Sequence, residues 1–247
     1  MNIDWRTPRH ATALHAVLAS RGGIPFVDAA IEQQAANRLP ELSQPNLVNL
    51  AGAVACGVER PADLPAAMDA WPDPSDELAY RIRPLREQWE ARGSGLLRQL
   101  QQFTDTRTLP SSATVALVLP VIGGHGVALP QHSAVLLEAV LANPHPQLPE
   151  VVRLAWLLSR LVARDEFHVA VLPAILSAAA EVELLVADER TLSTALIAWR
   201  VEVDQEQATR LAERLWRWWS VYRDSSQTWA EAVNAWAVDQ GNLSSGL

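Results

Sequence analysis

Apolar residues in the first hundred positions recur at helical spacing, in short runs separated by prolines and glycines. Runs of this kind that start near a proline and stop at a glycine, or before the next proline, are typical of short helices. The predicted helices cover residues 8–19, 25–38, 45–54 and 61–70, and a longer one covers 73–103 with a possible break at 93–95.

The pattern changes in the middle of the chain. Residues 114–122 form a short, β-branched, apolar run bounded by turn-forming residues, which predicts a buried strand. A second short strand is expected at 127–129. The run 133–141 fits either a strand or a helix, and its shortness and the proline-containing loop after it favour a strand. We therefore expect strands only within a small central sheet spanning about 113–142.

Helical periodicity returns in the rest of the chain. The predicted helices cover 148–162, 167–186, 189–201, 205–222 and 226–238, with Pro173 expected to kink or split the second of them. The fold class that results is α+β, mostly helical with a small central sheet. The alternative is an all-α fold with one hairpin.

This pattern also suggests a division of the chain. We expect an N-terminal helical segment over 1–72 and an α+β core over 73–190. Tryptophan-rich C-terminal helices over 191–240 would pack on that core, and 241–247 would form a flexible tail.

Six of the ten tryptophans lie after residue 198. One helical stripe there contains Leu211, Leu215, Trp218 and Tyr222, and such stripes are most often part of a core. Trp216 and Trp219 widen this stripe beyond one face. They are therefore the candidate interaction surface for a protein partner or for a second copy of the chain.

Composition narrows the possible partners and chemistries. The formal net charge of −8 argues against nucleic-acid binding, because an acidic surface repels phosphate backbones. All 20 basic residues are arginine, which suggests a GC-rich, bacterial coding bias. The lack of lysine excludes a Walker A loop, a protein-kinase site and enzymes that use a lysine Schiff base.

Cysteine and histidine usage argues against bound metal. Cys56 is the one cysteine, so the chain can form no internal disulfide and no cysteine-based zinc site. The six histidines show no pair at the spacing that places two imidazoles on one helix face. We expect no metal, no cofactor and no membrane span, and a cytoplasmic location.

Two further features of the sequence bear on a site. The glycine-rich loop 123–126 fits a tight hairpin turn, which we favour, or a loop whose bare amides approach a ligand. Glu181 lies in an otherwise apolar helical run. A carboxylate there requires a partner if it is buried.

The order of elements over about 75–190 resembles the core of gluzincin-type zincin metallopeptidases. That order is a long helix, a buried strand, a glycine-rich turn, another strand, a proline-rich loop and a helix. The last helix contains Leu154 and Ala155, which match the start of the family's Leu-Ala-His-Glu-Leu-Gly-His-Leu motif.

The catalytic positions of that motif are replaced in this chain. Trp156 takes the place of the first zinc histidine, Leu157 that of the catalytic glutamate and Arg160 that of the second histidine. The family's third ligand is a glutamate about twenty residues further on, where this chain has Glu181. The resemblance therefore implies a fold without zinc or an activated water, in which an Arg160–Glu181 ion pair could occupy the place of the metal.

The function expected from these observations is that of a non-catalytic binding or scaffold protein, since no complete catalytic set is present. The alternative is a metal-independent enzyme with a cleft near His125, Arg160 and Glu181, and Trp156 and Leu157 complete this candidate degenerate site.

Overall fold

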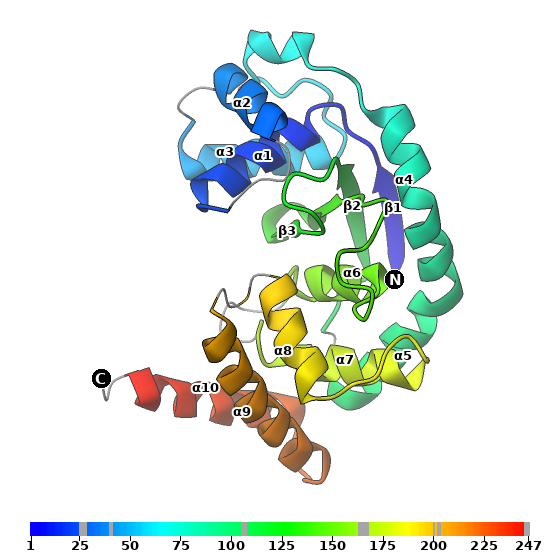
Figure 1. The fold of residues 1–247 in the computed structure, drawn as a ribbon, viewed down its shortest axis with the longest axis vertical. Coiled ribbons are helices and arrows are strands. Elements are labelled where there is room, and N and C mark those ends of the chain that lie inside the picture. Colours follow the sequence, from blue (N-terminus) through cyan, green and yellow to red (C-terminus); the bar gives the residue numbers. More distant parts are fainter. Residues whose placement is uncertain are drawn as a thin grey trace. The chain divides into compact units, whose positions relative to one another are not determined.

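The computed structural model describes residues 1–24, 29–39, 42–104, 108–162, 168–199, 201 and 204–244. The chain divides into two units. The first contains Met1–Glu87 and Ser111–Pro144, and the second contains Gln88–Pro110 and His145–Leu247. The predicted fold class is confirmed, because helices dominate and the strands form one small mixed sheet (Figure 1).

The sheet belongs to the first unit and has four strands in the order β1-β2-β4-β3. Their bounds are Asn2–Arg6 for β1, Ser112–Val118 for β2, Gly126–Leu129 for β3 and Ala134–Glu138 for β4. β1 and β4 both run parallel to β2, whereas β3 runs antiparallel to β4. The carboxyl ends of β1, β2 and β4 therefore meet at one edge of the sheet.

Helices α1 (Ala11–Arg21) and α3 (Gln44–Ala55) pack on one face of this sheet, and α2 (Ala29–Arg38) packs on α1. The strand residues on this face include Ala116, Val118 and Leu136, which join the apolar residues of α1 and α3 in one core. Leu117 and Leu137, on the opposite face, are also buried. Burial on both faces explains why β2 and β4 are almost entirely apolar.

The remaining helical elements of the first unit are the 3₁₀ turns η1 (Ala66–Ala70) and η3 (Pro130–His132) and the helix α4 (Ser75–Gln88). Gly52 in α3 lets η3 approach closely, because a Cβ there would lie 2.0 Å from a ring carbon of His132. This contact fixes the turn that leads into β4.

The second unit is helical over its described residues. Its elements are the π-helical turn η2 (Trp89–Gly93), α5 (Ser94–Thr104), α6 (Glu150–Ser159), α7 (Val171–Glu181), α8 (Glu189–Ala198), α9 (Gln205–Arg223) and α10 (Trp229–Ser244). Side-chain caps start α8 and α9, where Asp188 accepts from the Thr191 amide and Asp204 from the Gln207 amide. Trp219 is almost fully buried in this unit and donates its indole N–H to Ser177 at 2.9 Å.

The prediction that strands occur only within 113–142 is wrong, because β1 lies at the N-terminus and pairs with β2. The predicted strand over 133–141 is confirmed in its central part by β4. Pro173 does not kink its helix, because it occupies the first turn of α7, where proline is tolerated.

The unit boundaries differ from those expected at residues 72 and 190, because β1 brings the N-terminal segment into the same unit as the sheet. Helix α10 continues to Ser244, so the expected tail over 241–247 is partly helical, and 245–247 lie outside the described residues. Within the described part of the chain, no helix combines the length and the apolar character needed to cross a membrane.

Candidate functional site

A buried carboxylate, that of Glu138, lies at the carboxyl end of β4. Glu138 is fully buried, and the backbone amides of residues 121–125 all donate to its two carboxylate oxygens at 2.8 to 3.2 Å. His15 of α1 is also fully buried and approaches the same carboxylate, with its Nε2 2.8 Å from Oε1. The loop, the helix and the strand are thus joined at one side chain.

Opposing effects set the pKa of this carboxyl group. Burial raises the pKa of Glu138, but the hydrogen bond and charge of His15 and the amides of Ile122 and His125 outweigh it, and the pKa is held well below its usual range. The carboxylate is therefore ionised and hydrogen-bonded without access to solvent. Its physical role is to fix the loop after β2, not to meet a ligand.

The favoured interpretation of loop 123–126 as a tight hairpin turn is wrong. β2 and β3 do not pair with each other but with β4, so the loop is a longer connection in which Gly123 and Gly124 adopt positive φ. Its amides do surround an anion, as the other interpretation held, but that anion is the chain's own Glu138. A single carboxylate in the apolar run 133–141 was the available signal, and sequence reasoning missed it.

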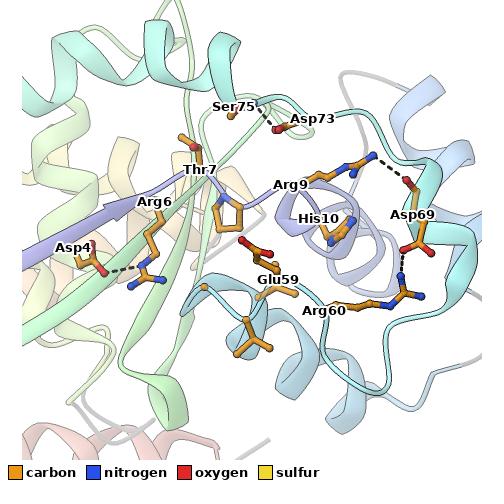
Figure 2. A pocket seen from close by; sticks show the side chains of 14 residues that line it. Asp4, Arg6, Thr7, Arg9, His10, Glu59, Arg60, Asp69, Asp73 and Ser75 are labelled. Carbon is orange, nitrogen blue, oxygen red and sulfur yellow. Dashed lines mark hydrogen bonds and ion pairs between the residues drawn. The ribbon is translucent and has the colours of Figure 1, made fainter.

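A polar pocket lies beside the carboxyl end of β1, within the first unit (Figure 2). Its volume is about 650 Å³, which falls within the range of about 300–1,000 Å³ typical of ligand pockets. Three segments line it: residues 4–10 from β1 to the start of α1, residues 54–60 after α3, and residues 69–75 before and at the start of α4. Sequence reasoning did not find this site, because no motif marks it.

Arg6 and Arg9 are held at the pocket wall by backbone carbonyl groups. Arg6 donates to the Cys56 carbonyl at 2.7 Å and also to the Asp4 carboxylate. Its guanidinium lies directly over Gly57, where a Cβ would be 1.6 Å from Nη1. Arg9 donates to the carbonyls of Trp71 and Asp69 at 2.7 and 2.9 Å, so both side chains are oriented before any ligand binds.

Arg60 is the third arginine of the pocket. It donates to the Asp69 carboxylate at 2.5 Å, across the pocket rim (Figure 2). Asp73 accepts from the backbone amide of Ser75 at 3.0 Å. These two carboxylates therefore have partners within the protein.

His10 precedes α1 and lines the pocket. It is only 8% exposed, and its Nε2 is buried without a hydrogen-bond partner among the described residues. Burial, assisted by the nearby positive charge of Arg9, lowers the pKa of His10, against smaller opposing effects from backbone hydrogen bonds of Met68 and Glu59 and from the negative charge of Asp69. The lowered pKa favours the neutral imidazole, and its Nε2 forms no hydrogen bond of ordinary distance and angle with the described residues.

The residues of the predicted degenerate site belong to different units. His125 belongs to the first unit, where its ring stacks on His15, whereas Trp156, Leu157, Arg160 and Glu181 belong to the second. Trp156 and Leu157 are buried in α6, and the guanidinium of Arg160 lies 5.2 Å from the Trp156 ring, as their spacing predicts.

Glu181 does not take the place predicted for it. It is exposed at the C-terminal end of α7, and no ion pair between it and Arg160 is formed among the described residues. The expected buried Arg160–Glu181 pair is therefore wrong, because the end of α7 leaves this carboxylate in water.

The predicted interaction surface is also changed by burial. Trp219 is 1% exposed and packs in an aromatic cluster with Tyr222 and Trp229, so it cannot meet a partner. Trp216 is half-buried. The buried face of α9 contains Ala212, Leu215 and Trp219 rather than Trp218, which is a small rotation of the expected stripe. That the chain binds a protein partner or a second copy of itself stays a prediction.

Among the residues that the structure describes, no three or more histidine, cysteine, aspartate or glutamate side chains are grouped as metal ligands would be. The relation to zincin-like proteins stays a prediction. No family model, curated protein or solved structure matches this chain.

Proposed function

We propose that the chain is a non-catalytic binding protein, and that its first unit holds a small polar ligand in the pocket beside β1. The observation that carries this proposal is the buried, unpartnered Nε2 of His10 in the wall of that pocket. Buried polar atoms without a partner are costly and uncommon in folded proteins. A bound ligand would supply the missing hydrogen bond.

The arginines support the same proposal. Nη2 of Arg6 and Nη1 of Arg9 donate to no protein group within the described ranges, although other atoms of both side chains are anchored. An anchored guanidinium loses little conformational entropy when a ligand binds, which favours affinity. The pocket thus presents oriented donors to a polar group.

Binding is better supported than catalysis. The histidine–carboxylate contact of His15 with Glu138 is fully buried and is occupied in fixing a loop. A general base must come within hydrogen-bond reach of its substrate, and this pair does not reach solvent. The alternative of an enzyme with a cleft near His125, Arg160 and Glu181 loses support, since Glu181 is exposed and unpaired with Arg160.

We also propose, from the composition of the sequence, that the protein acts in the cytoplasm of a bacterium. The single cysteine is compatible with a reducing compartment. The partner of the second unit, another protein or a second copy of the chain, is likewise proposed from the sequence alone.

The test is a ligand-detected NMR screen of small anions, cations, zwitterions and neutral polyols against two variants. Val58→Trp places an indole at a pocket-lining residue that is 47% exposed, and Val186→Trp makes the same change at a 75% exposed residue of the second unit. We expect at least one class to bind the wild type and Val186→Trp but not Val58→Trp. Binding of no class, or binding that Val58→Trp leaves intact, would overturn the proposal.

A further inference from the structure

The charged groups that line the β1 pocket are of two kinds, those with a partner in the protein and those without. Asp4 pairs with Arg6, and Asp69 pairs with Arg60. The Asp73 carboxylate is occupied by the amide of Ser75. The charges of Asp4 and Asp69 are thus compensated in the absence of a ligand, whereas the neutral amide of Ser75 leaves the negative charge of Asp73 in place.

Two further charges have no ion-pair partner among the described residues, and they have opposite signs, so that the pocket keeps one positive and two negative charges without such a partner. The guanidinium of Arg9 makes its hydrogen bonds to carbonyl groups, which leave its positive charge in place. Glu59 is exposed, and its carboxylate forms no hydrogen bond or ion pair with any residue in the described ranges. In the view of Figure 2, this carboxylate lies between Arg6 and the His10 ring.

The signs of these charges select among ligand classes. A simple anion would meet Arg9 but would be repelled by Glu59, and a simple cation would meet Glu59 but would be repelled by Arg9. A molecule that carries one group of each sign compensates both residues. Nη1 of Arg9 suits a carboxylate, because it can donate a charge-assisted hydrogen bond while Nε and Nη2 stay anchored.

We infer that the β1 pocket binds a small zwitterion, with its carboxylate on Arg9, its ammonium group on Glu59 and a further polar atom on the unpartnered Nε2 of His10. Free amino acids and short peptides share this chemistry, and a cavity of about 650 Å³ has room for either. This inference rests on the proposed binding function and specifies its ligand class.

The test uses the intact chain and compares probes that differ by one charge. An equimolar mixture of the twenty amino acids is first tested by ligand-detected NMR, and diglycine and triglycine are tested separately. The tightest binder is then compared by calorimetry with its amide, which lacks the carboxylate, and with its N-acetyl derivative, which lacks the ammonium group. We expect each derivative to bind at least about tenfold more weakly.

A variant tests whether Glu59 is the residue that binds the ammonium group. Glu59→Gln should remove the preference for the free ammonium group, so that the parent compound and the N-acetyl derivative bind equally. Glu213→Gln, at an exposed glutamate of α9, is the matched control and should keep the full preference. Because Glu59 makes no contact that the fold needs, its variant should remain folded.

Several outcomes distinguish this inference from the proposed function. Equal binding of the parent compound and both derivatives by the wild type, or a Glu59→Gln variant that keeps the ammonium preference, would overturn the zwitterion. The same holds if no amino acid or peptide binds while another class from the screen binds in a manner that Val58→Trp abolishes, in which case the binding function itself stands. If no class binds at all, both fail.

Discussion

The carboxyl ends of β4 and β1 lie at the same edge of one sheet, yet they use polar groups in opposite ways. At the end of β4, the Glu138 carboxylate meets five backbone amides and His15, and both of its oxygens are occupied. At the end of β1, His10, Arg9 and Glu59 keep polar atoms that no described residue satisfies. Burial, charge and an unsatisfied polar atom do not mark a binding site by themselves, since Nδ1 of the fully buried His15 also has no partner among the described residues; the difference at the end of β1 is that such an atom lines a pocket.

The largest effect on stability is expected when the Glu138 carboxylate at the end of β4 is removed. Glu138→Ala would leave five backbone amides and the buried His15 without their acceptor, which should lower the free energy of unfolding by about 3–5 kcal/mol. Glu138→Gln keeps one acceptor oxygen and should cost less. Because two units need not unfold together, amide hydrogen exchange in β2 and β4 is the suitable measurement. A cost below about 1 kcal/mol for Glu138→Ala would contradict the role of this carboxylate in fixing the loop after β2.

The low pKa of Glu138 predicts how stability changes in acid. Its pKa in the folded state lies below the ordinary value of 4.5, so the unfolded chain takes up this proton first as the pH falls. The contribution of Glu138 is therefore complete above about pH 5 and is lost progressively below it. The wild type should lose stability more steeply than Glu138→Gln over this range in urea denaturation. Parallel curves for the two proteins would contradict the assigned shift.

A smaller effect is expected when the pocket wall is disturbed. Gly57→Ala would force a residue at φ +91° and would push its Cβ into Arg6, at a cost of about 1–3 kcal/mol and with loss of ligand binding. Gly23→Ala is the matched control, because Gly23 also has positive φ but has no atom within 4 Å of the added Cβ. Equal effects of the two changes on stability and on binding would show that Arg6 does not depend on Gly57.

The smallest effect on stability is expected at Glu59. This exposed carboxylate has no partner among the described residues, so Glu59→Gln should change the free energy of unfolding by less than about 0.5 kcal/mol. Thermal denaturation without ligand measures this change in stability. Repeating it with ligand measures binding as well, since a ligand stabilises the fold that binds it. A cost above about 1 kcal/mol would mean that Glu59 serves the fold instead.

Several elements could be predicted from the sequence because local pattern decides them. Apolar, β-branched composition identified β2 and β4, and helical periodicity identified α6, α8 and α9. β1 was missed because it is half-exposed and is held by a strand more than a hundred residues away in the chain. Helical period also failed to separate Trp218 from Trp219, since neighbouring positions differ by only about 100° around a helix.

The sites depended on contacts that no spacing reveals. Glu138 was visible as a carboxylate in an apolar run, but its acceptance of the loop amides follows from the pairing of β4 with β2 and β3. The β1 pocket joins residues 4–10 to segments that begin about fifty and sixty-five residues further along the chain. Arg6 and Arg9 are anchored by backbone carbonyl groups, which any residue type supplies. The resemblance to gluzincins directed attention to Glu181, whose exposure is set by where α7 ends.

The most direct test of the contrast between the two strand ends is a map of backbone amide chemical shifts in the ¹⁵N-labelled protein. The amino-acid mixture would be added first, and the probes that carry a single charge would follow. We predict that a zwitterion shifts the amides of residues 6–10 and 57–60 and leaves those of 121–125 unchanged, because Glu138 already occupies them. Shifts centred on 121–125, with residues 6–10 unaffected, would contradict the account.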